Sequence, residues 1–208
     1  MQKNRSSKLE FIALMAALMS VTALAIDALL PALDIIGIDL GVVLQADNQL
    51  LITMIFLGLG LGPLLFGPLS DAIGRKPSVY MGFSVFLLAS FVCVQATSLE
   101  MMIVGRILQG IGLSAPRTIC IAIIRDLYQG DYMARVMSFV TIVFLLIPIV
   151  APAMGKFVLD SYTWQAIFYV PAAISVVVTI WFWLRQKETL AVNNRIPFQF
   201  HRLIKGTK

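Results

Sequence analysis

The segment Gly67–Pro77, with the sequence GPLSDAIGRKP, is a short polar interruption between two long apolar runs. These runs cover residues 48–68 and 78–96, and each has about the 20 residues that a helix needs to cross a membrane. Glycine and proline stand at both ends of the interruption, where they act as turn signals. The segment therefore predicts a tight connection between two antiparallel membrane helices.

Four further apolar runs extend this pattern over the whole chain. The 208 residues are 59% hydrophobic and 13% charged, with a mean hydropathy of +0.89. A soluble domain is about half apolar and roughly a quarter charged. We predict an all-α membrane protein, because packed helices satisfy their own backbone groups in lipid. The predicted bundle of residues 10–184 has its spans at about 10–31, 48–68, 78–96, 99–124, 133–155 and 163–184.

The basic residues predict the orientation of this bundle. Lys and Arg in short loops stay on the cytoplasmic side, and here they fall on one side of the predicted spans, with only Lys156 opposite. Both termini are then cytoplasmic, as an N-terminal segment 1–9 and a basic tail 185–208. The first run also resembles a secretory signal peptide, but its cleavage would leave five spans and break this asymmetry.

Three charges lie well inside the predicted spans: Asp27, Arg106 and Arg117. A charge in the bilayer centre costs about 2.5 to 3.5 kcal/mol, so each is a functional candidate. Helical rise places Asp27 and Arg106 at similar heights, and Arg106 and Arg117 on one face of their helix. Two interpretations stay open. Asp27 is a protonatable carboxylate tuned by the guanidinium, or the two residues form a static ion pair that joins two helices.

Other functional classes find little support in the sequence. The net charge of +5 is explained by membrane topology, so we expect no nucleic-acid partner. We expect no enzyme, metal site or cofactor, because the single histidine, His201, lies in the tail and no span holds paired catalytic carboxylates. Cys93 and Cys120 fall inside apolar runs, as packed thiols do. Gly58 and Gly62 stand four apart in one span and predict close helix packing.

The polar interruption closely resembles the signature loop of the major facilitator superfamily, in spacing, charge order and topology. In that family the loop latches two halves of the transporter when the outside is open. The resemblance assigns this role to Gly67, Asp71, Gly74 and Arg75, with Asp126 as a partner for Arg75. Gly67 would permit a close helix contact, and Gly74 would permit a tight turn.

Three further motifs are similar to those of twelve-helix drug:proton antiporters, and the likeness is closest to the bicyclomycin-resistance type. One is Asp27–Pro31 in the first span, and another is Arg106 with Gln109, Gly110 and Gly112 in the fourth. The third, in the fifth span, contains Pro148, Pro152 and Gly155, but Ile147 and Lys156 depart from its usual glycines. This departure bears on antiport more than on the fold.

The resemblance implies proton-coupled efflux of drugs or other small lipophilic compounds across a bacterial inner membrane. Asp27 would carry the proton and Arg106 would tune it. The residues expected to line the substrate cavity are Arg117, Gln109, Met19, Met54 and Phe144. Arg117 matches no family motif, so its place there is our inference from charge alone. The methionines and Phe144 are equally consistent with packing or lipid contact.

Facilitator transporters consist of two six-helix halves, each built from inverted three-helix repeats, and this chain supplies one half. We expect a fragment or truncated gene, or a half-transporter that pairs with a copy of itself or with a separate second half. The main alternative is an inactive six-helix remnant that serves as a binding or assembly module. Sugars or organic anions are alternative substrates on the same fold.

Overall fold

The computed structural model describes residues 8–196 and contains six long helices. Residues 1–7 and 197–208, which belong to the predicted terminal segments, lie outside the described part. The long helices are α1 (Lys8–Asp27), α3 (Leu50–Ile73), α4 (Arg75–Val94), α5 (Leu99–Leu127), α6 (Gly130–Ser161) and α7 (Gln165–Arg185). The short elements are α2 (Leu33–Asp39) and the 3-10 turns η1 (Leu30–Ala32), η2 (Gln45–Gln49) and η3 (Val192–Asn194).

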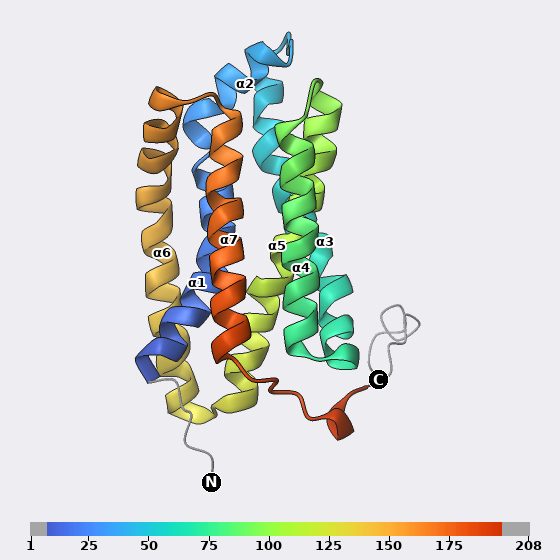
Figure 1. Ribbon diagram of the computed structural model, residues 1–208, viewed down its shortest axis with the longest axis vertical. Coiled ribbons are helices and arrows are strands. Elements are labelled where there is room, and N and C mark those ends of the chain that lie inside the picture. The colour runs from blue at the N-terminus through green and yellow to red at the C-terminus, as the bar shows by residue number, and fades with distance from the viewer. Residues whose placement is uncertain (1–7, 197–208) are drawn as a thin grey trace.

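Six helices in the described part are long and apolar enough to cross a membrane, as the sequence predicted. They stand side by side with alternating direction, and α2 lies at one end of the bundle (Figure 1). We call the opposite end, where α1 begins and α7 ends, the basic end. The described basic residues at this end are Lys8, Arg75, Lys76, Arg125, Arg135, Arg185, Lys187 and Arg195.

The packing of the helices follows an inverted repeat. The first triplet is α1, α3 and α4, and the second is α5, α6 and α7. Helix α3 packs on α5 just as α6 packs on α1, and α4 packs on α5 just as α7 packs on α1. Exchanging the two triplets therefore exchanges these contacts, which is the arrangement expected of one half of a facilitator transporter.

The polar segment 67–77 is more helical than predicted. Helix α3 continues through Pro68 to Ile73, and α4 begins at Arg75, so Gly74 alone separates them. Gly74 has a φ of 112°, which glycine adopts without the steric cost that a side chain brings. The predicted turn at Gly74 is confirmed, but the expected loop around it was too long.

Other helix ends also differ from the prediction. Helix α1 ends at Asp27 rather than near residue 31, because Pro31 lacks a backbone N–H and is taken up by η1. Helix α6 runs from Gly130 to Ser161, beyond the predicted span at both ends. The length of an apolar run indicates the part of a helix that lies inside lipid. It does not indicate how far the helix continues outside lipid through polar turns.

Close packing at Gly58 and Gly62 of α3 is confirmed. A Cβ at Gly58 would collide with the backbone of α5 at Ile107 and Gly110, and one at Gly62 would collide with Ser114. Small residues let two membrane helices approach until their backbones touch. Helices α3 and α5 therefore form a tight pair that carries the residues of the candidate site.

Candidate functional site

Arg106 lies at the centre of a hydrogen-bond network inside the bundle. Its side chain is 0% exposed. Nε donates to the backbone oxygen of Leu51 at 2.8 Å, and Nη1 donates to that of Ala25 at 3.2 Å. Nη1 also donates to Oε1 of Gln109 at 2.9 Å, and Gln109 Nε2 donates to Ser90 Oγ at 2.8 Å. One guanidinium from α5 thus links α1 and α3 directly, and α4 through Gln109.

Asp27 ends α1, two residues after the carbonyl that Arg106 binds. The predicted match in height between Asp27 and Arg106 is therefore present. However, no ion pair in the described part of the chain joins the two residues, and Nη2 of Arg106 has no hydrogen-bond partner. A static ion pair is thus absent from this conformation. The guanidinium has neutral acceptors and one free donor group beside the end of α1.

The predicted cavity residues fall into two groups. Met19 is 8% exposed and Gln109 is 0% exposed, so both belong to the interior of the bundle rather than to an open cavity in this conformation. Their positions follow from packing: Met19 joins the apolar core, and Gln109 is held by Arg106. Met54 on α3 and Phe144 on α6 are half-buried. Arg117 is exposed and lines a hollow between α3 and α5.

The predicted helix-five motif meets the end of α1. A Cβ at Gly155 would collide with the backbone of Ala28, directly after Asp27. Pro148 and Pro152 lie inside α6, where Pro148 is exposed and Pro152 is half-buried. The glycine therefore lets the backbone of α6 contact the backbone next to the candidate proton carrier.

Arg75 is the centre of a second polar cluster, at the basic end. Its Nη1 donates to Asp71 Oδ1 at 2.6 Å and to Ser70 Oγ at 2.8 Å. Its Nε donates to Asp126 Oδ2 at 3.1 Å. The predicted contact between Arg75 and Asp126 is thus confirmed, and it ties the start of α4 to the end of α5.

The close contact predicted at Gly67 is wrong for this conformation. A Cβ at Gly67 would meet no atom within 4 Å. The residue instead lines a hollow of about 420 Å³ together with Asp71, Arg75 and Asp126. The glycine leaves this surface of α3 flat and open, because the helix has no side chain there.

Glu188, which was not predicted as a site residue, completes the cluster. Its carboxylate accepts hydrogen bonds from the backbone N–H groups of Arg75 and Lys76, each at 3.0 Å, and from those of Thr189 and Leu190, also at 3.0 Å. Thr189 Oγ1 donates to Asp126 Oδ2 at 2.9 Å. The one sequence signal was that Glu188 is the only acidic residue in the basic tail.

The segment after α7 therefore lies against the turn at Gly74. We call residues 186–196 the strap. Besides the contacts of Glu188 and Thr189, Ile196 donates its N–H to the backbone oxygen of Asp71 at 3.0 Å. Figure 1 shows the strap running from the end of α7 along the basic end of the bundle. A carboxylate at the first N–H groups of α4 also interacts favourably with the helix dipole.

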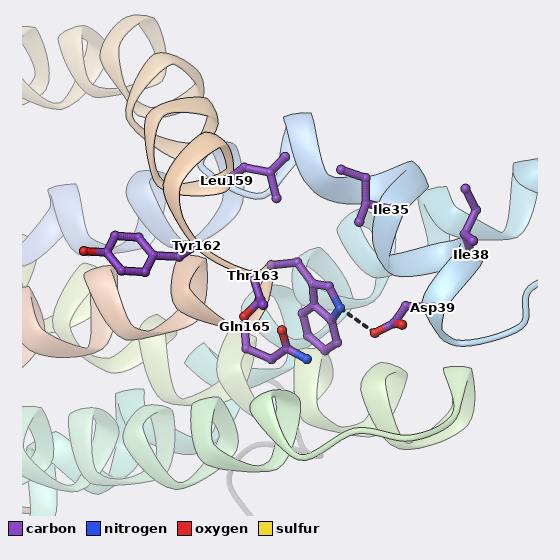
Figure 2. Close-up of a pocket in the computed structure, with 8 residues that line it drawn as sticks. Ile35, Ile38, Asp39, Leu159, Tyr162, Thr163 and Gln165 are labelled. Carbon is purple, nitrogen blue, oxygen red and sulfur yellow. Dashed lines mark hydrogen bonds between the residues drawn. The ribbon is translucent and has the colours of Figure 1, made fainter.

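A pocket at the other end of the bundle was also not predicted. It has a volume of about 440 Å³ and lies between α2 and the connection of α6 to α7. Figure 2 shows Ile35, Ile38 and Asp39 on one side and Tyr162 on the other. Trp164 Nε1 donates a hydrogen bond to Asp39 Oδ2. That bond is 2.7 Å long, and Trp164 is 4% exposed. The indole thus fixes α2 against the bundle.

The fold and these buried charges define one six-helix half of a membrane transporter. The chain belongs to the Major Facilitator Superfamily, whose family model matches residues 12–205. Over 97% of its length it also superposes on 53% of the crystal structure of the human organic anion transporter MFSD10, with a TM-score of 0.71 and 17% identity. At that identity the likeness concerns the fold.

Two curated relatives show that the chain spans about half of a longer type of protein. It is 31% identical over 191 residues to a bicyclomycin resistance protein homolog of Haemophilus influenzae, covering 92% of this chain and 48% of that protein. It is 33% identical over 153 residues to the multidrug resistance protein MdtL of Klebsiella pneumoniae, covering 74% of this chain and 39% of that protein.

Proposed function

We propose that this chain is one six-helix half of an exporter that couples the outward movement of drugs or other small lipophilic compounds to the entry of protons. The names of the relatives, a bicyclomycin resistance protein homolog and a multidrug resistance protein, support this substrate class. Membership of a transporter family supports transport rather than an enzymatic reaction.

The observation that carries the proposal is the free donor group of Arg106 beside the end of α1. The guanidinium stays protonated, and its other donors are held by neutral acceptors from α1, α3 and α5. When Asp27 is ionised, its carboxylate would be attracted toward the free N–H groups of Nη2 through a shift of the last turn of α1. When Asp27 is protonated, this attraction is lost. The protonation state of Asp27 would thus bias the position of α1.

Helix α6 would transmit this movement. The backbone of Gly155 lies against Ala28, so a shift in the last turn of α1 must move α6 or open a gap there. Pro148 and Pro152 of the same helix remove backbone hydrogen bonds and make it easier to bend. The three motif residues would then connect the proton carrier to the predicted cavity residues Met54, Phe144 and Arg117.

The second polar cluster would act as the conformational latch. Arg75 holds Asp71 and Asp126 together at the basic end, and Gly74 allows the abrupt turn between α3 and α4. The open surface at Gly67 would receive part of a second half when the basic end is closed. We place this end in the cytoplasm of a bacterial cell, with both termini on that side, because the basic residues gather there.

A second six-helix half, either a copy of this chain or a separate one, would cover the substrate-facing surface. Helix α6 supports this requirement, because much of its apolar surface is uncovered. Leu145, Ile149 and Val150 are among its exposed side chains. Lipid covers such a surface without cost, but the half-buried Asp27 nearby favours protein or water over acyl chains.

Efflux by cells that make the chain tests this function. The cells are loaded with ethidium and energised, and its accumulation is compared between wild type and Asp27→Asn at equal amounts of protein in the membrane. We expect wild type to lower accumulation several-fold and Asp27→Asn to lose the effect, because an amide cannot carry the proton. Resistance to bicyclomycin is scored in the same strains.

Asp160→Asn is the matched control, since Asp160 is an exposed carboxylate whose ion pair is with the exposed Lys156 of the same helix. It should transport like wild type. Equal accumulation with and without the wild-type chain would contradict transport by this chain and favour the module without transport. Efflux by Asp27→Asn that still follows the proton gradient would remove Asp27 from the coupling.

A further inference from the structure

A hollow of about 300 Å³ lies between α3 and α5, in the half of the bundle nearer the basic end. Helix α3 contributes the apolar side chains of Leu59 and Pro63. Helix α5 contributes two arginines, Arg117 and Arg125, and the hydroxyl group of Thr118 between them. Among the described residues that line the hollow there is no carboxylate, so its wall carries two positive charges.

Neither arginine is neutralised by the described part of the chain. The two nearest acidic groups at the basic end, Asp71 and Asp126, are both held by Arg75. Asp126 also accepts a hydrogen bond from Thr189 of the strap, and Arg125 lines the neighbouring hollow of Asp71 and Asp126 without an ion pair to either carboxylate. Arg117 lies inside a span, where a guanidinium without an anionic partner is costly, and this cost favours binding of an anion.

The spacing of the arginines fits one anionic group. Arg117 and Arg125 are eight residues apart, which places them on one face of α5 and about 12 Å apart along its axis. Their long side chains can converge on a group at the level of Ile121, midway between them. Guanidinium groups bind phosphate and carboxylate through paired N–H donors in a fixed plane.

We propose that this hollow binds the anionic head group of an amphiphile, a phosphate or a carboxylate, between Arg117 and Arg125. The alkyl chain would lie against Leu59, Pro63 and Ile121. A free inorganic ion does not explain these apolar walls, nor the depth of Arg117 within α5. An amphiphile would bind both the arginines and the apolar walls of the hollow. Basic hollows between membrane helices at the cytoplasmic side bind anionic lipid head groups in other membrane proteins.

The two sources of such a ligand are an anionic phospholipid of the inner leaflet and a soluble amphiphilic anion. Both are tested by native mass spectrometry of the purified full chain in a neutral detergent, titrated with phosphatidylglycerol or with dodecyl phosphate. Phosphatidylcholine serves as the zwitterionic comparison. We expect one anionic ligand per chain, and an apparent affinity roughly tenfold lower in Arg117→Gln and in Arg125→Gln.

The control is Arg135→Gln, which removes the same charge from an exposed position on α6 that does not line the hollow. It should change the affinity less than twofold. Tighter binding of phosphatidylglycerol assigns the site to lipid, and tighter binding of dodecyl phosphate assigns it to a soluble anion. Equal loss in all three variants, or equal binding of phosphatidylcholine, would overturn the proposal. Binding at this site does not require transport, so this result is independent of the efflux experiment.

Discussion

Glu188 stabilises a helix end that lies 112 residues away from it in the sequence. Its carboxylate is the acceptor for the first two N–H groups of α4, which have no partner within the helix. Replacing such a cap by alanine costs about 1 to 2 kcal/mol. We therefore predict that Glu188→Ala lowers the stability of the purified chain by about this amount. It should also raise hydrogen exchange at the amides of Arg75 and Lys76, measured by mass spectrometry.

Lys187→Ala is the matched control, because Lys187 is the exposed neighbour of Glu188 in the strap. Its exchange pattern at Arg75 and Lys76 should equal that of wild type. Unchanged protection of these two amides in Glu188→Ala would mean that the strap does not hold the turn at Gly74. The contact between Glu188 and the start of α4 could not be predicted from the sequence. No pattern around a single glutamate in a basic tail indicates a partner so far away along the chain.

At the scale of elements, the spans were readable from the sequence because one quantity, the length of an apolar run, decides them. The ends of the helices could not be read from run length, because polar residues such as Asp71 and Arg75 extend the helices beyond the apolar runs. These residues are stabilised in the helices by pairing with each other, which hydropathy does not record. Arg106 was identified by its cost in lipid, but two of its three acceptors are backbone oxygens, which every residue carries and no pattern distinguishes.

The pairing of α3 with α5 depends on a glycine in a way that can be measured. In Gly58→Ala the new Cβ lies 2.8 Å from the backbone nitrogen of Ile111 and 2.9 Å from the Cα of Gly110, so the helices must separate. We predict a loss of about 1 to 3 kcal/mol, the usual cost of overpacking, measured by unfolding in detergent and denaturant. Efflux should fall with it, because the same helix pair carries Arg106.

Gly60→Ala provides the comparison within the same helix. A Cβ at Gly60 would meet no atom within 4 Å, so the substitution only improves helix propensity. It should leave stability unchanged or raise it by up to about 1 kcal/mol. If both variants lose the same stability, the effect belongs to glycine in α3 in general, and the close contact between α3 and α5 is not what holds the pair.

At the scale of the whole molecule, orientation decides what kind of second half the chain can accept. In the described part of the chain the basic end carries the lysines and arginines outside the spans, except for Lys156 at the far end. Two copies inserted by the same rule have the same orientation, and a pair of such copies has the parallel arrangement of the two halves of a facilitator transporter. An antiparallel pair would place the clusters around Arg75 on opposite sides of the membrane, where they could not act together as one latch.

Cysteine labelling distinguishes these arrangements. Val43→Cys lies in the exposed connection between α2 and α3, and Asn193→Cys lies in the strap. The native Cys93 and Cys120 are both 0% exposed, so their background reaction with a maleimide should be low. We predict that a membrane-impermeant maleimide labels Val43→Cys in intact cells, and labels Asn193→Cys only after the cells are permeabilised. Labelling of both positions in intact cells would indicate mixed orientation and an antiparallel pair, and the reverse pattern would place the candidate latch outside the cell.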